Sequence, residues 1–206
     1  MPLRSLTGHD RLSRVDVRLE TDRLVLRGFT EADVDDIATL LGNAAVTRFT
    51  EGRPITRAEV EERTLPDILR QYRELPAGMG RFAAVDKATG TFVGWFSLRP
   101  ANSRGLDGGT ELGYRMLPAH WGQGLATEGA RALVDSAFAD LGADRVVATT
   151  MTVNAASRRV LEKAGLRFVR TFFLDWPEYL EGAEHGDVEY ALTREQWAAR
   201  DAGTVG

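Results

Sequence analysis

The residues best suited to chemistry form a glycine-spaced turn that leads directly into an amphipathic helix, within 120–138. Gly122 and Gly124 lack a Cβ atom, so the backbone can turn sharply there and its N–H groups can approach a ligand closely. The first amides of a helix have no acceptor inside the helix, and the helix dipole makes that end positive. This combination suits a pyrophosphate group, although a tight turn that binds nothing would have the same glycine spacing.

The elements around this turn are clearly marked in the sequence. The helix carries apolar residues at intervals of three and four, and Gly142 is placed to end it. Residues 110–117 are of strand-forming types, and Pro118 closes the strand. The unit differs from two common phosphate loops, because the chain has no G-x-x-x-x-G-K-S/T sequence and Thr127 stands where the dinucleotide fingerprint requires its third glycine.

A second strand and helix follow directly. Residues 145–153 are rich in β-branched types, which favour a strand. Asn154 is a strong helix N-cap, and Gly165 is placed to end the helix that begins there. The chain therefore contains two strand-to-helix units in succession.

Together these units resemble the GNAT N-acetyltransferase superfamily, and most closely its bacterial ribosomal-protein N-terminal acetyltransferase branch. The resemblance rests on ELGY at 111–114, WGQGLATE at 121–128 and NAASRRVLEKAGL at 154–166, and it extends over roughly 19–192. It implies acetyl-CoA as the donor, an amine as the acceptor, and direct attack of the amine on the thioester in a ternary complex.

The resemblance also assigns coenzyme contacts to individual residues. The backbone amides of Gln123, Gly124, Leu125, Ala126 and Thr127 are expected to hold the pyrophosphate, Met116 and Leu117 to bond the pantetheine arm, and Asn154 and Ser157 to flank the thioester. Arg158 lies near the start of the second helix and could meet the phosphates, or it could be a solvated charge on the helix surface.

Two proton transfers need catalytic groups. An amine with a pKa of about 10.4 is mostly protonated at neutral pH and must lose a proton before it attacks. Glu111, at the start of the central strand, is the candidate base, and its alternative role is that of an exposed carboxylate at a strand end. Many family members protonate the leaving thiolate with a tyrosine where this chain has Leu161, so the resemblance assigns that role to Ser157. Ser157 could instead bond local backbone, and Tyr114 and Tyr190 are further candidate donors or packed aromatics.

The acceptor region is indicated by an uneven charge distribution. Between Arg170 and Arg194 there is no lysine or arginine, whereas acidic and aromatic residues are frequent. Such a segment would attract a cationic amine and pack its carbon frame against rings. We therefore predict that Trp176, Glu178 and Tyr179 border the acceptor cleft, the alternative being a solvated loop over buried aromatics.

Composition narrows the remaining possibilities. The 206 residues, 43% hydrophobic and 27% charged, are typical of a globular domain with a substantial core. Without cysteines the chain has no disulfides or thiolate chemistry, and its three histidines lack metal-site spacing, so no metal is predicted. A net charge of -4 argues against nucleic-acid binding. No apolar run reaches the roughly 18 residues that a membrane helix needs, and the start lacks a signal-peptide core, so we predict a cytoplasmic protein without a membrane partner.

The remaining patterns complete an α+β fold. We predict a single domain at 19–200, with an N-terminal extension at 1–18 and a C-terminal tail at 201–206. Its central sheet is mixed, mostly antiparallel, with about six to seven strands flanked by helices, and its exposed edge strands suggest a homodimer. Further strands are predicted at 23–30, 79–86, 91–98, 167–175 and 187–192, and a loop at 99–109. Thr30 and Asp33 form a capping pair for a predicted helix that carries Val34, Ile37, Leu40 and Leu41. Further helices are predicted at 56–72 (kinked or split at Pro66) and 193–200.

Two functions from different classes stay open. The first is an acetyl-CoA-dependent N-acetyltransferase that acts on a protein N-terminus or a small amine. The second is a non-catalytic acyl-CoA-binding sensor or interaction protein of the same fold. Transfer of a longer acyl group is a third possibility, since the sequence does not reveal the depth of the pocket.

Overall fold

A computed structural model describes residues 17–101, 106, 108–174 and 180–202 of the chain. Within these residues one sheet has eight strands in the order β1-β2-β3-β4-β5-β6-β8-β7. The predicted α+β fold with a mixed sheet flanked by helices is confirmed, with one strand more than expected. The strands are β1 (Val17–Glu20), β2 (Leu24–Gly28), β3 (Gly80–Asp86), β4 (Phe92–Pro100), β5 (Thr110–Met116), β6 (Arg145–Met151), β7 (Arg167–Phe172) and β8 (Asp187–Thr193).

The additional strand, β1, is short and lies at one edge of the sheet. It pairs with β2 through an irregular register between Val17 and Leu19. Four residues are too few for an alternating pattern to stand out from the sequence, so the strand was not predicted. The described elements run from β1 to Ala202, and most of the predicted extension and tail lies outside the described residues.

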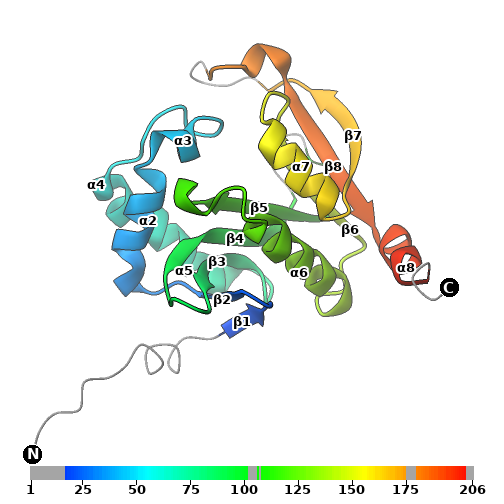
Figure 1. Ribbon diagram of the computed structural model, residues 1–206, viewed down its shortest axis with the longest axis horizontal. Coiled ribbons are helices and arrows are strands. Elements are labelled where there is room, and N and C mark those ends of the chain that lie inside the picture. The colour runs from blue at the N-terminus through cyan, green and yellow to red at the C-terminus, as the bar shows by residue number, and fades with distance from the viewer. Residues whose placement is uncertain (1–16, 102–105, 107, 175–179, 203–206) are drawn as a thin grey trace, which may run out of the picture.

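Helices cover both faces of the sheet (Figure 1). Phe96 and Trp95 are neighbours in β4 and point to opposite faces, where each belongs to a separate hydrophobic core. The core around Phe96 includes α6 and α7, and the core around Trp95 includes α2 and α5. The helical segments are η1 (Glu31–Asp33), α2 (Val34–Leu41), α3 (Ala44–Thr47), α4 (Arg57–Glu59), η2 (Val60–Thr64), α5 (Leu65–Glu74), η3 (Pro118–His120), α6 (Leu125–Ala139), α7 (Ala155–Lys163), η4 (Ala183–His185) and α8 (Arg194–Ala202).

The segment around Pro66 is split, as predicted. Proline lacks an amide hydrogen, so it cannot donate to the carbonyl of Glu62 in a regular helix. The chain accommodates it with the π-helical segment η2 between α4 and α5, in which the Leu65 amide donates to the Val60 carbonyl five residues earlier. The α-helix is therefore split by a bulge in the helical hydrogen-bond pattern, and the sequence did not indicate that helical turns continue through the split.

The predicted loop at 99–109 begins two residues too early. Arg99 and Pro100 belong to β4, where they pair with Glu111 and Thr110 of β5. A proline is tolerated at the end of a strand, where its missing amide costs no interior hydrogen bond. The longer strand brings the Arg99 side chain beside Glu111.

The strands β5 and β6 form the parallel pair of the sheet, and their pairing is brief. Each strand has seven residues, but only Thr110 with Val146 and Glu111 with Val147 are in register as partners. Beyond these pairs the strands separate, and each leads into a loop and then a helix, α6 after β5 and α7 after β6. A gap therefore opens in the sheet at the end where both helices begin.

Within the described ranges, no helix is long and apolar enough to cross a lipid bilayer. The same residues contain no group of three or more histidine or carboxylate side chains arranged to hold a metal ion.

Gly129 allows α6 to approach β4 closely, and this contact can be tested. An added Cβ atom at Gly129 would lie 2.3 Å from Cζ of the fully buried Phe96. We expect Gly129→Ala to lower the free energy of unfolding by about 1–3 kcal/mol, even though alanine favours the helix more than glycine. Chemical denaturation measures this change.

Phe96→Leu provides the control for this contact. If the ring causes the destabilisation, Gly129→Ala should cost less in the Phe96→Leu background than in the natural protein. Equal costs in the two backgrounds would contradict the proposed contact.

Candidate active site

The glycine turn before α6 has the backbone shape that a ligand loop requires. Gly122 and Gly124 adopt left-handed conformations with φ of 73° and 80°, and Gly124 is the N-cap of α6. A Cβ atom at Gly122 would meet nothing within 4 Å, so the space beside the turn is open. The two glycines therefore form the sharp turn that their spacing predicts, with open space beside Gly122.

The amides of this turn are available for binding. In the part of the chain that the structure describes, the amides from Gly122 to Thr127 donate to no protein acceptor. The Glu128 amide is the first to be satisfied, because it donates to the Gly124 carbonyl at 3.0 Å. The expected pyrophosphate ligands thus form one row at the positive end of α6. These groups fit a diphosphate, and their contact with a coenzyme stays a prediction.

Arg23 fixes the loop from a distant part of the sequence. Its guanidinium donates to the Gln123 carbonyl at 2.9 Å and to the Glu128 carboxylate at 2.7 Å. Burial opposes ionisation of Glu128, but hydrogen bonds from Thr21 and Arg23 outweigh it and lower the pKa of Glu128 below its ordinary value. Sequence reasoning missed this anchor because no local spacing links Arg23, just before β2, to the start of α6.

The start of α7 lies close to β5 across the gap. The Asn154 side chain caps the helix by accepting from the Ser157 amide at 3.2 Å, as a helix N-cap is expected to do. The Ser157 hydroxyl lies 3.0 Å from the Tyr114 hydroxyl, which also donates to the Ser157 carbonyl at 3.0 Å. These contacts connect β5 with the element after β6 at the point where the two strands have separated.

Tyr114 remains a hydroxyl donor under ordinary conditions. Burial raises the pKa of Tyr114 well above its usual value, and its bond to Ser157 only partly offsets this. Its ring packs 6.0 Å from that of Phe96. Tyr114 is therefore both a packed strand aromatic and a partner of the candidate acid Ser157.

Glu111 is buried and ion-paired, not an exposed strand-end carboxylate as the alternative reading had it. Its exposed fraction is 7%, and its carboxylate accepts from Arg99 at 3.0 Å. Because strand residues alternate, Glu111 points to the face opposite Tyr114. The structure therefore does not bring Glu111 and Ser157 together, and a catalytic role for Glu111 stays a prediction.

Other expected coenzyme contacts involve groups that already have protein partners. The Met116 carbonyl accepts from the Trp121 indole at 2.7 Å, and the Leu117 amide donates to Val93 at 2.9 Å. Arg158 donates to the Thr152 carbonyl and the Tyr190 hydroxyl, both at 3.1 Å. A coenzyme could therefore contact Met116, Leu117 and Arg158 only through their other polar atoms.

The expected acceptor residues Trp176, Glu178 and Tyr179 lie outside the described residues. Two acidic residues of the same segment are neutralised by arginines. Glu181 pairs with Arg48, and Glu189, which is 3% exposed, pairs with Arg145 and Arg170.

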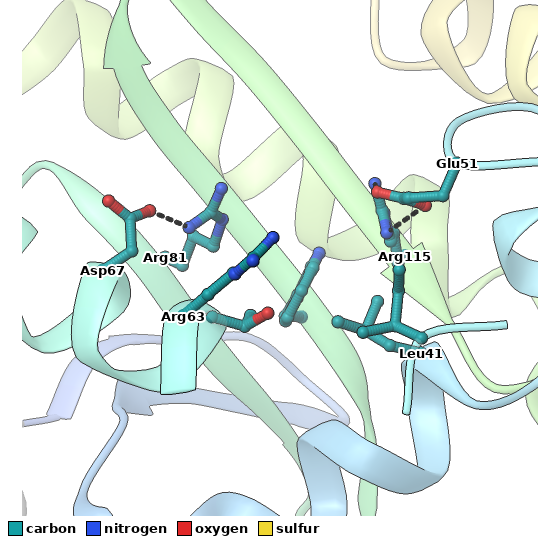
Figure 2. Close-up of a pocket in the computed structure, with 9 residues that line it drawn as sticks. Leu41, Glu51, Arg63, Asp67, Arg81 and Arg115 are labelled. Atoms are coloured by element: carbon teal, nitrogen blue, oxygen red, sulfur yellow. Dashed lines mark hydrogen bonds and ion pairs between the residues drawn. The ribbon is translucent and has the colours of Figure 1, made fainter. Parts of the chain in front are cut away.

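A cavity of about 300 Å³ lies on the face of the sheet opposite α6 and α7. Figure 2 shows two ion pairs along its wall, Arg81 with Asp67 and Arg115 with Glu51, and the Arg63 side chain extending into the space between them. Sequence reasoning missed this site, because its residues come from several separate elements and share no motif. The lining residues are Leu41, Glu51, Ile55, Arg63, Thr64, Asp67, Arg81, Trp95 and Arg115.

Comparison with known protein families shows which family this chain belongs to. Residues 23–167 match the acetyltransferase (GNAT) domain family. The chain belongs to the GNAT acetyltransferase family. The predicted family is confirmed, and the gap between β5 and β6 with its two helix starts is the candidate donor site of this GNAT protein.

Similar proteins include acetyltransferases of different named activities. A protein of Aspergillus fumigatus named FsC-acetyl coenzyme A-N(2)-transacetylase is 45% identical over 151 residues, which cover 71% of this chain and 63% of that protein. This GNAT chain therefore spans less than two thirds of that relative's length. The uncharacterized N-acetyltransferase YoaA of Bacillus subtilis is 32% identical over 152 residues, or 72% of this chain and 82% of its own.

A solved structure shares the fold. RimL, a ribosomal L7/L12 alpha-N-protein acetyltransferase in complex with coenzyme A, matches with a TM-score of 0.68 and 19% identity, over 88% of this chain and 99% of its own. The relatives together support an acetyl-CoA-dependent GNAT acetyltransferase acting on an amine, and they do not favour the non-catalytic alternative.

The glycine turn gives a direct test of the coenzyme site. Alanine at Gly124 would carry a strain of about 1–2 kcal/mol in the left-handed region and would reorient the free amides. We expect Gly124→Ala to weaken CoA binding by about tenfold, as measured by calorimetric titration. Gly142→Ala is the matched control, because Gly142 has a φ of 69° at the opposite end of α6.

The two variants carry similar backbone strain and differ in their distance from the turn. CoA affinity should therefore be unchanged in Gly142→Ala. Natural affinity in Gly124→Ala would show that the turn does not bind the coenzyme.

Proposed function

We propose that this protein transfers the acetyl group of acetyl-CoA to the primary amine of a small molecule by direct attack in a ternary complex. The observation that carries this proposal is the row of unsatisfied amides from Gly122 to Thr127 at the start of α6. A small acceptor is favoured over a protein N-terminus because the name of the relative with 45% identity specifies transfer to an N(2) nitrogen and mentions no protein. The ribosomal acetyltransferase shares the fold at 19% identity.

The donor side of the mechanism follows from the gap in the sheet. Beyond Glu111 the edge of β5 has no strand partner on the β6 side among the described residues. Buried backbone polar groups need partners, and an extended pantetheine arm with its amides can supply them. The free amides at α6 would hold the diphosphate, so that the thioester is directed toward Tyr114 and Ser157.

The reaction forms a bond between the amine nitrogen and the acetyl carbon and breaks the carbon–sulfur bond. The amine loses one proton, for which Glu111 is the candidate acceptor, directly or through water. The departing sulfur gains one proton, for which the Ser157 hydroxyl is the candidate donor. Tyr114 holds that hydroxyl in position across the gap.

The proposed acid predicts a specific loss of turnover. Removing a general acid lowers a rate by about 10²–10⁴-fold. We expect Ser157→Ala to lower kcat by at least about 10²-fold while the KM for acetyl-CoA changes little. Steady-state release of the free CoA thiol measures both parameters.

Ser157→Cys keeps a proton donor at this position and should recover part of the lost turnover. Full turnover in Ser157→Ala would show that another group protonates the sulfur.

The proposed base predicts a dependence on pH. We expect Glu111→Gln to lower kcat/KM at neutral pH and to recover as the pH rises toward about 10.4, where an ordinary amine loses its proton without help. Turnover between pH 7 and 10 measures the recovery. Glu189→Gln is the matched control, because Glu189 is also a buried carboxylate paired with arginines.

Glu189→Gln should show no selective recovery at high pH. An equal defect of Glu111→Gln at every pH would indicate that Glu111 has a structural role through Arg99.

We also propose a homodimer, for which the edge strand β7 offers exposed apolar side chains at Phe168 and Val169. A cytoplasmic location remains part of the proposal, because the proposed donor is a coenzyme of the cell interior.

A further inference from the structure

The cavity on the face opposite α6 and α7 contains more positive than negative charge. Its lining carries the three arginines Arg63, Arg81 and Arg115 and the two carboxylates Glu51 and Asp67. Both carboxylates are already committed to arginines of the wall. The guanidinium of Arg63 makes no hydrogen bond or ion pair with any residue that the structure describes. Because the Arg63 guanidinium has no acidic partner among the described residues, it is available to bind an anion that enters the cavity.

The arginines of the wall are held in place. Trp95 lies between two of them, with its ring 5.6 Å from the Arg81 guanidinium and 5.5 Å from that of Arg115. Arg115 binds Glu51 through both terminal nitrogens, at 2.9 and 2.7 Å. Fixed guanidinium groups lose little entropy when they bind a planar anion.

The positive charge is concentrated enough to affect ionisation. Burial lowers the pKa of Arg81, and repulsion from Arg99 and Arg115 lowers it further, although the bond to Asp67 opposes both. An anion placed among these groups would relieve that repulsion.

The π-helical segment η2 contributes the third arginine of the cavity, Arg63. Arg63 and Thr64 end the π-helical segment η2 just before Pro66, and both line the cavity. π-helical turns are rare and often occur at functional sites. Here the bulge carries the unpaired guanidinium over the sheet toward the wall formed by β3 and β5.

The cavity reaches the same part of β5 as the proposed reaction centre, from the opposite face of the sheet. Arg115 directly follows Tyr114 in β5, in the part of the strand that has separated from β6. Between Arg115 and Glu111, the same face of β5 carries only Gly113, whose register partner is Ser97. This stretch of β5 therefore carries no bulky side chain of its own between the candidate base and Arg115.

We infer that this cavity binds a carboxylate of the acceptor, so that the substrate class is amines that also carry a carboxylate group. The inference rests on the proposed acetyl transfer. It differs from the acidic acceptor strip expected from the sequence, because the charges that line the described cavity favour an anion.

Three amines of the same chain length test the inference. These are 6-aminohexanoate, hexylamine and 1,6-diaminohexane, which differ in having a carboxylate, a methyl group or a second ammonium at the far end. Each is titrated calorimetrically into the full-length protein saturated with CoA, and each is assayed with acetyl-CoA for release of the free thiol. We expect 6-aminohexanoate to bind at least about tenfold more tightly than either other amine.

Substitutions of Arg63, which is exposed and lines the cavity, test whether the preference for a carboxylate arises at the cavity. Arg63→Gln should reduce the preference for 6-aminohexanoate by about tenfold without changing CoA affinity, and Arg63→Lys should retain part of it. Arg73→Gln is the matched control, because Arg73 is an exposed arginine of α5 that does not line the cavity. Thermal denaturation of each variant verifies that it is folded.

Calorimetric binding of the amines tests the carboxylate site, whereas CoA binding and thiol release test the proposed acetyl transfer. Equal or tighter binding of 1,6-diaminohexane, or a carboxylate preference that persists in Arg63→Gln, overturns the inference whether or not acetylation occurs. Tight binding of 6-aminohexanoate that Arg63→Gln weakens supports the inference, even if no amine releases the CoA thiol. Absence of CoA binding and thiol release with every amine overturns the proposed function.

Discussion

The structure depends on the early separation of β5 from β6. The two strands are in register for only two residue pairs, although each is seven residues long. A strand in the middle of a sheet normally has its backbone groups satisfied on both edges. The separation leaves the β6-facing edge of β5 beyond Glu111 without a strand partner among the described residues, while the other edge stays paired with β4. Tyr114 and Ser157 connect β5 with α7 across the gap through their hydroxyl groups. The gap is the position at which an extended ligand can complete the sheet.

The alternation of side chains along β5 divides the site between the two faces of the sheet. Tyr114 points toward the face covered by α6 and α7, where the free amides of the glycine turn also lie. Glu111 and Arg115 point toward the other face, with the cavity and its arginines. A donor held at the amides and an acceptor held at the arginines would therefore approach the same strand from opposite sides.

The local charge at the cavity is positive, although the chain has a net charge of -4. Glu111, Glu51 and Glu189 are all paired with arginines, so these acidic residues do not form a free anionic surface. The cavity instead has an excess of guanidinium groups. Buried ion pairs are costly when one partner is lost, so the pairs Arg99–Glu111 and Arg115–Glu51 also contribute to the structure of the site.

The sequence by itself determined the features that depend on local chemistry. Glycine spacing fixed the turn before α6, Asn154 fixed the start of α7, and Pro66 fixed the split between α4 and α5, because backbone conformation and capping act over a few residues. Only the tertiary structure decided the contacts between distant segments, such as Arg23 with the glycine turn and Arg63 beside the wall of β3 and β5. It also decided that Ser157 lies on the face opposite Glu111, because alternation along β5 separates Glu111 from Tyr114 but no local pattern records which of these faces α7 covers.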